Sequence, residues 1–129
     1  PLYVKHEGKE LLIVSSNGTV IAYTANDGKE LWKIEGFSGN TIPSASVLGN
    51  QVLIGAGGMR GKEPDKGAKS NCCILISEKD GKPTHEIQWN AKAGIANYMT
   101  PLAYEGHAYF VNSVGLLYCY DLKTGKEIY

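Results

Sequence analysis

Two adjacent cysteines, Cys72 and Cys73, are the residues of this chain whose types are best suited to chemistry. A vicinal thiol pair could form a redox-active disulfide or lie beside a cofactor. The surrounding segment, SNCCILIS, predicts instead that the pair opens a β-strand, in which successive side chains point to opposite faces. We therefore expect one thiol to be buried as a small hydrophobe and the other to be exposed or near the edge. Cys119 lies within another predicted strand and is interpreted as a core residue.

A glycine-rich stretch, VLIGAGGMRGK, looks at first like a strand that leads into a phosphate-binding loop. Its spacing does not fit: Ala56 stands where a Walker loop requires glycine, Glu63 where it requires Ser or Thr, and Arg60 where a third Rossmann glycine belongs. The following KEPDKGAKSN is predicted to be non-helical, so no helix N-terminus would face a phosphate. We interpret the whole of Gly55 to Asn71 as an irregular, mobile excursion that is well placed to contact a partner.

The remaining polar residues predict neither a metal site nor a catalytic nucleophile. His6, His85 and His107 lack a second His, Cys or carboxylate pair at ligand spacing, and we interpret them as surface or turn residues. No Gly-x-Ser-x-Gly motif occurs. Asn17-Gly18-Thr19 fits the glycosylation pattern, but Asn-Gly between two apolar strands favours a tight hairpin.

The elements that must position these residues are repeated along the chain. Gly18 to Trp32 (GTVIAYTANDGKELW) matches Gly115 to Tyr129 (GLLYCYDLKTGKEIY) without a gap, each aligned pair being 97 positions apart. A looser copy, Ile74 to Trp89, contains Gly81 at the shared glycine and a four-residue insertion before the aromatic. Copies spaced by about 40 to 55 residues indicate a repeat architecture.

Each repeat predicts four short antiparallel strands, because short apolar runs rich in β-branched and aromatic residues alternate with glycine turns. No window shows helical periodicity. We therefore predict an all-β chain of about three four-stranded propeller blades, one partial domain over 1–129 with repeats at roughly 1–42, 43–99 and 100–129. The expected strands are 2–4, 11–15, 20–24, 30–34, 45–48, 51–55, 73–77, 86–89, 102–104, 108–112 and 116–120.

The repeat resembles the tryptophan-docking pattern Ala-x-Asp-x-x-x-Gly-x-x-x-Trp of the PQQ-like (quinoprotein-type or BamB-like) β-propeller repeat family. Ala22, Gly28 and Trp32 carry the resemblance in the first copy, and Asp121 and Gly125 in the last. It implies a segment of a larger propeller with seven or eight blades, in a periplasmic or otherwise extracytoplasmic protein. It also implies structural docking roles for six residues: Gly28, Trp32, Gly81, Trp89, Gly125 and Tyr129. The copies depart from the pattern at Thr24, Leu75, Ser77, Cys119 and Tyr129.

The composition gives little indication of a partner. The chain of 129 residues has 13 basic and 13 acidic residues, so its formal net charge is zero and it shows no electrostatic footprint for nucleic acid. No apolar run approaches the roughly 18 residues of a membrane helix. Three blades cannot close a ring of about four to eight, so we interpret the sequence as an excerpt of a longer protein.

Topology predicts one binding face. In an up-and-down blade, the connection between the second and third strands and the connection between blades emerge at the same end. The long connections Lys33–Pro43, Gly55–Asn71 and Asn90–Thr100 should therefore gather there, where rigid scaffolds often carry sites. The candidate binding residues are Asn40, Arg60, Asn97 and Tyr98, and the expected partner is a protein or a cell-envelope ligand.

Three functions fit these features: a non-catalytic scaffold or recognition module, a part of a PQQ- and calcium-dependent quinoprotein alcohol dehydrogenase, and a sensor propeller linked to a kinase. The first requires no special residues and is favoured. The sequence shows no carboxylate cluster at the inner strand ends, and Glu78, Asp80 and Asp121 are interpreted as hairpin residues. We therefore predict that this segment alone binds neither PQQ nor calcium.

Overall fold

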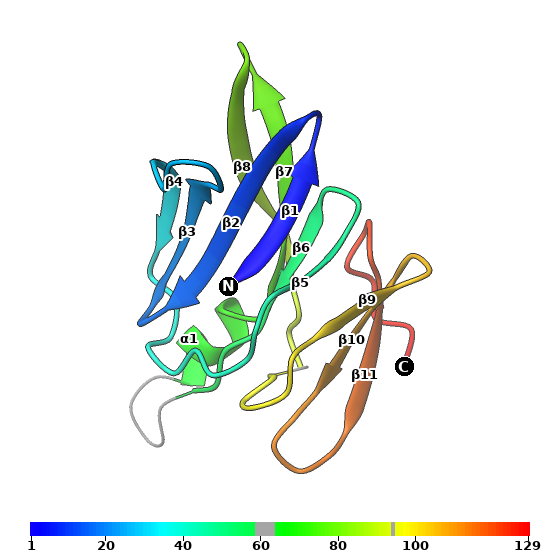
Figure 1. Ribbon diagram of the computed structural model, residues 1–129. Helices are drawn as coiled ribbons and strands as arrows, with labels where there is room; N and C mark the ends of the chain where they lie inside the picture. Colours follow the sequence, from blue (N-terminus) through cyan, green and yellow to red (C-terminus); the bar gives the residue numbers. More distant parts are fainter. Residues whose placement is uncertain (59–63, 94) are drawn as a thin grey trace.

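The computed structural model describes residues 1–58, 64–93 and 95–129 (Figure 1). Apart from one short helix, the regular structure of these residues is β-strand, arranged as three antiparallel sheets. The first sheet consists of β1 (Leu2–His6), β2 (Lys9–Ser16), β3 (Thr19–Thr24) and β4 (Glu30–Glu35). The second consists of β5 (Ser46–Leu48), β6 (Gln51–Ile54), β7 (Cys72–Lys79) and β8 (Lys82–Asn90). The third consists of β9 (Leu102–Tyr104), β10 (His107–Val111) and β11 (Leu117–Asp121).

Each predicted strand is confirmed, with ends that differ by a few residues. The tight turns account for much of this agreement. Asn17 and Gly18 both have positive φ, 47° and 81°, which confirms the Asn-Gly hairpin between β2 and β3. The third sheet differs from the expected four strands, because it has three strands. Beyond them, residues 126–129 pair with β11 through the Tyr120–Glu127 bridge and through backbone hydrogen bonds, such as that from the Ile128 N–H to Cys119 O.

A shared irregularity shows that the repeat extends to strand register. In the first sheet the register shifts beside Ala22, which lies opposite Trp32. In the second it shifts beside Cys73, which lies opposite Trp89. A β-bulge of this kind places an extra residue on one strand and re-aims the side chains around it. Each aromatic therefore projects from the same face of its sheet.

Two apolar cores join the three sheets. One lies between the first and second sheets and includes Leu11, Ile13, Val20, Ile74 and Ile76. The other lies between the second and third sheets and is formed chiefly by Leu53, Trp89, Ala108, Phe110 and Tyr120. The second sheet is consequently covered on both faces, which explains why β6 and the start of β7 are buried at every position.

The segment KEPDKGAKSN contains a helix, so the prediction that it is non-helical was wrong. Helix α1 (Pro64–Lys69) is six residues long and ends where Ser70 donates backbone hydrogen bonds to Lys66 and Gly67. Helices this short have little intrinsic stability and depend on tertiary contacts. Gly67 supplies such a contact, because a side chain there would lie 3.1 Å from the backbone of Gly58.

Candidate functional site

The three long connections meet at one end of the molecule, the lower end in Figure 1. Hydrogen bonds link the first two of them: the Gly57 N–H donates to Asn40 O at 2.9 Å, and the Ser38 N–H donates to Ser70 Oγ at 2.7 Å. The isolated β-bridge between Asn40 and Gly57 fixes their register. We call the surface formed by residues 36–45, 55–58, 64–71, 91–93, 95–101 and the β10–β11 turn at 112–116 the loop face.

Asn71 is the centre of the hydrogen-bond network under the loop face, and its side chain is fully buried. Its Oδ1 accepts from the Ala96 N–H at 2.8 Å and from the Ala56 N–H at 3.4 Å. Its Nδ2 donates to Ala56 O at 2.8 Å and to Gly67 O at 2.6 Å. The amide of Asn71 thus ties the segment that follows β6, helix α1 and the β8–β9 connection together. The described parts of Gly55–Asn71 are therefore packed, which corrects the expectation of an irregular excursion.

Two of the four candidate binding residues, Asn40 and Asn97, converge above Gly57. A Cβ atom built on Gly57 would lie 2.7 Å from both Asn40 Nδ2 and Asn97 Oδ1. Both asparagines are half-buried, whereas Gly57 beneath them is buried. Tyr98 follows directly and is 64% exposed. The fourth candidate, Arg60, lies outside the described residues.

The loop face also exposes apolar side chains, of which only Tyr98 was among the residues predicted from the sequence. Besides Tyr98, the loop face exposes Ile42, Met99, Val114 and Leu116, each by half or more of its surface. Residues 36–45, 91–101 and 112–116 contain a single charged residue, Lys92. Large apolar residues in connections with few charges were the signal available in the sequence. The charges of the loop face are otherwise confined to the segment of helix α1, which contains Asp65, Lys66 and Lys69. Exposed apolar side chains gathered in this way are typical of interaction sites.

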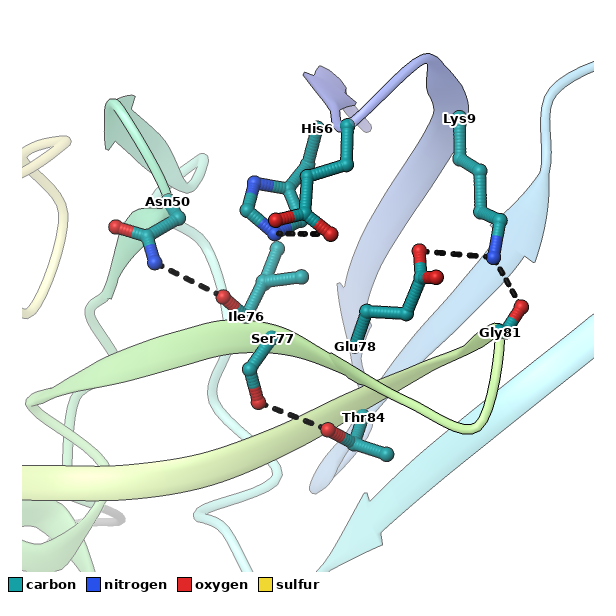
Figure 2. Close-up of polar contacts among 9 residues, drawn as sticks. His6, Lys9, Asn50, Ile76, Ser77, Glu78, Gly81 and Thr84 are labelled. Atoms are coloured by element: carbon teal, nitrogen blue, oxygen red, sulfur yellow. Dashed lines mark hydrogen bonds and ion pairs between the residues drawn. The ribbon is translucent and has the colours of Figure 1, made fainter.

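A separate cleft of 420 Å³ lies between the first and second sheets, at the end away from the loop face. It lies between the first sheet and the β7–β8 hairpin, which the four-residue insertion lengthens. Figure 2 shows how Lys9 fixes this hairpin: its Nζ lies 2.9 Å from the Glu78 carboxylate and donates to Gly81 O. Leu11, Leu31 and Pro83 contribute apolar lining. None of the candidate binding residues lines the cleft.

The two tryptophans that were predicted to dock between sheets, Trp32 and Trp89, have different surroundings. Trp89 is 8% exposed, stacks on Tyr120 and donates from Nε1 to Leu122 O at 2.8 Å. Its ring covers Gly125 so closely that a Cβ there would lie 2.4 Å from it. Trp32 is equally buried and contacts the ring of His85, but its Nε1 has no hydrogen-bond partner in the described structure.

The other predicted docking residues lie in open surroundings. Gly28 and Gly81 have positive φ, 69° and 73°, with no atom within 4 Å of a built Cβ. Tyr129 is 62% exposed. His85 was expected at the surface, but its ring is half-buried and contacts Trp32. Desolvation by this burial lowers the pKa of His85.

Cys72 and Cys73 open β7 as predicted, but the expectation that one thiol is exposed was wrong. Cys72 belongs to the core between the first and second sheets, and Cys73 to the core between the second and third. The first sheet covers the Cys72 side chain, and the third sheet covers the Cys73 side chain. Burial raises the pKa of Cys73 to about 12 and raises that of Cys72 still further. Thiols on opposite faces of a strand do not fit a vicinal disulfide beside a cofactor.

We expect native Cys72 and Cys73 to resist alkylation by iodoacetamide at pH 8. With a pKa of about 12, only about one Cys73 thiol in ten thousand is ionised at that pH, and the thiolate is the reactive form. Mass spectrometry after timed labelling should show both residues unmodified in buffer and modified in 6 M guanidinium on the order of minutes. Rapid labelling of either residue in the native protein would contradict the burial described above.

The described residues contain no group of three or more His, Cys, Asp or Glu side chains arranged to hold a metal ion. Within the same residues, no helix is long and apolar enough to cross a membrane. The statement that this segment binds neither PQQ nor calcium remains a prediction.

No protein-family model matches the sequence, and no curated protein sequence matches it significantly. Among solved structures, the chain is similar to BamB from Moraxella catarrhalis, with a TM-score of 0.58 and 16% identity. The match covers 98% of this chain and 34% of that structure. The chain thus spans about a third of its structural neighbour, and its fold is that of a β-propeller segment.

Proposed function

We propose that this chain is a non-catalytic propeller segment that recognises polypeptide at its loop face and acts as a scaffold or recognition module in the cell envelope. The observation that carries the proposal is the loop face itself. It presents Ile42, Tyr98 and Met99 on connections that buried hydrogen bonds hold in place, and it presents Val114 and Leu116 on the β10–β11 turn. A rigid surface with protruding apolar and aromatic side chains has the composition of a protein interface core.

The fold is compatible with this proposal but does not determine function by itself. The likeness to BamB extends over nearly the whole chain and concerns a propeller of similar architecture. An extracytoplasmic location belongs to the proposal as well and rests on the family resemblance of the repeats. The charge balance is consistent with a polypeptide partner, since nucleic-acid recognition requires a basic surface.

Site-specific photo-crosslinking tests the proposal. Benzoylphenylalanine replaces Tyr98 on the loop face, and in a matched variant it replaces Lys123, which is exposed in a turn at the other end of its sheet. After illumination in cells that export the protein, we expect discrete polypeptide adducts at position 98 and none at position 123. Equal adducts at both positions, or none at position 98, would contradict recognition at the loop face.

A further inference from the structure

The side-chain amides of Asn40 and Asn97 meet at Gly57 on the loop face. Asn40 comes from the connection between the first and second sheets, and Asn97 from the connection between the second and third. Each amide approaches the same point, 2.7 Å from a built Gly57 Cβ. Neither side chain makes a hydrogen bond to the described part of the chain. A half-buried amide without a protein partner is a group that a ligand can satisfy.

The glycine beneath the amides makes their approach possible. Gly57 is in the buried bridge with Asn40, where its N–H donates to Asn40 O and its carbonyl accepts from Ser38 Oγ. Any side chain at position 57 would occupy the space into which both amides project. The site is therefore built on fixed backbone and is supported from below by the Asn71 network.

The chemistry of the surroundings favours one class of ligand. An asparagine amide offers both donors and acceptors, which match the alternating N–H and C=O groups of a peptide backbone. Ile42, Tyr98 and Met99 are exposed on the same two connections and would contact apolar side chains of such a peptide. These connections contain no carboxylate and one lysine, so they offer no countercharge for a highly charged ligand.

We propose that Asn40 and Asn97 bind the backbone of an extended, uncharged polypeptide segment, while Ile42, Tyr98 and Met99 contact its apolar side chains. This inference rests on the proposed function and specifies the partner as an extended strand instead of a folded charged surface. Extended peptides recognised in this way gain affinity from main-chain hydrogen bonds and specificity from alternate side chains.

The test uses a capped ten-residue peptide of alternating valine and serine, with binding followed by isothermal titration calorimetry. A second peptide carries N-methyl groups on its serine backbone nitrogens, which removes N–H donors and leaves the side chains intact. The protein variants are Asn40→Ala, Asn97→Ala and Gly57→Ala. Asn26→Ala is the matched control, because Asn26 is an exposed asparagine in a turn outside the loop face. Circular dichroism melting verifies that every variant folds.

We expect Asn40→Ala and Asn97→Ala each to weaken binding about tenfold, the effect of losing about one net hydrogen bond with its partner left unpaired. Gly57→Ala should weaken binding at least as much, and Asn26→Ala should leave it unchanged. The N-methylated peptide should bind more weakly by at least a similar factor.

Equal binding of both peptides, or wild-type affinity in the asparagine variants, would overturn backbone recognition while leaving the crosslinking result at position 98 intact. Amide-dependent binding of chitotetraose in place of the peptide would assign the site to a saccharide and would also overturn the inference. Absence of peptide binding together with absence of adducts at position 98 would overturn both the inference and the proposed function.

Discussion

Gly125→Ala should destabilise the protein by about 2 to 5 kcal/mol. The new methyl group would lie 2.4 to 2.6 Å from three atoms of Trp89, whose ring is packed between Phe110 and Tyr120 and cannot move freely. Overpacking of this kind costs about 1 to 3 kcal/mol. The φ of 67° at position 125 adds about 1 to 2 kcal/mol for a residue with a Cβ.

Gly81→Ala is the matched control for this prediction. Gly81 is the equivalent turn glycine of the second sheet, with a φ of 73°, but no atom lies within 4 Å of a Cβ built there. Its substitution should therefore cost only the backbone term, about 1 to 2 kcal/mol. Urea unfolding followed by tryptophan fluorescence measures both variants. Equal losses of unfolding free energy would show that Trp89 does not pack on Gly125 as described.

Asn71→Ala should lower the free energy of unfolding by about 3 to 5 kcal/mol. The substitution leaves buried groups of Ala56, Gly67 and Ala96 without the partners that Asn71 supplies. Each unsatisfied buried group costs about 1 to 3 kcal/mol, and water or local relaxation offsets part of the total. We expect the loop face to unfold before the rest of the protein in this variant, since all three partners lie beneath it.

Asn71→Asp separates the hydrogen bonds from the packing of the side chain. A carboxylate of the same shape still accepts from Ala96 N–H but cannot donate to Ala56 O or Gly67 O. We expect a loss of at least about 2 kcal/mol at pH 7, where the buried charge adds to the lost donors. A loss below about 0.5 kcal/mol for both variants, measured by urea unfolding, would contradict the central role of Asn71.

The repeat explains why so much of the fold could be predicted from the sequence. Asn17-Gly18 and the glycines of the later turns require positive φ, and the apolar runs between them are too short for helices. The strands β3, β7 and β11 therefore lie close to their predicted positions. Local chemistry alone sufficed for these elements, because a tight turn and a strand are each determined within a few residues.

The features that escaped prediction depend on contacts between distant segments. Cys72 and Cys73 are both buried because sheets cover both faces of β7, and a strand pattern does not reveal how many faces are covered. Helix α1 forms in a sequence with a central glycine because Gly67 packs on Gly58 and accepts from Asn71. Blade topology predicts that Asn40 and Asn97 lie at one end of the molecule, but their meeting at Gly57 depends on packing between connections distant in the sequence.

The most direct test of the account measures whether the loop face is one rigid body. Amide hydrogen exchange followed by nuclear magnetic resonance reports the Ala56 and Ala96 N–H groups, which donate to Asn71 Oδ1. We expect both amides in the wild type to be protected as well as those of the core strand β7, and both to lose protection together in Asn71→Ala. Exchange of the wild-type Ala96 amide as fast as that of an exposed loop would contradict a built loop face.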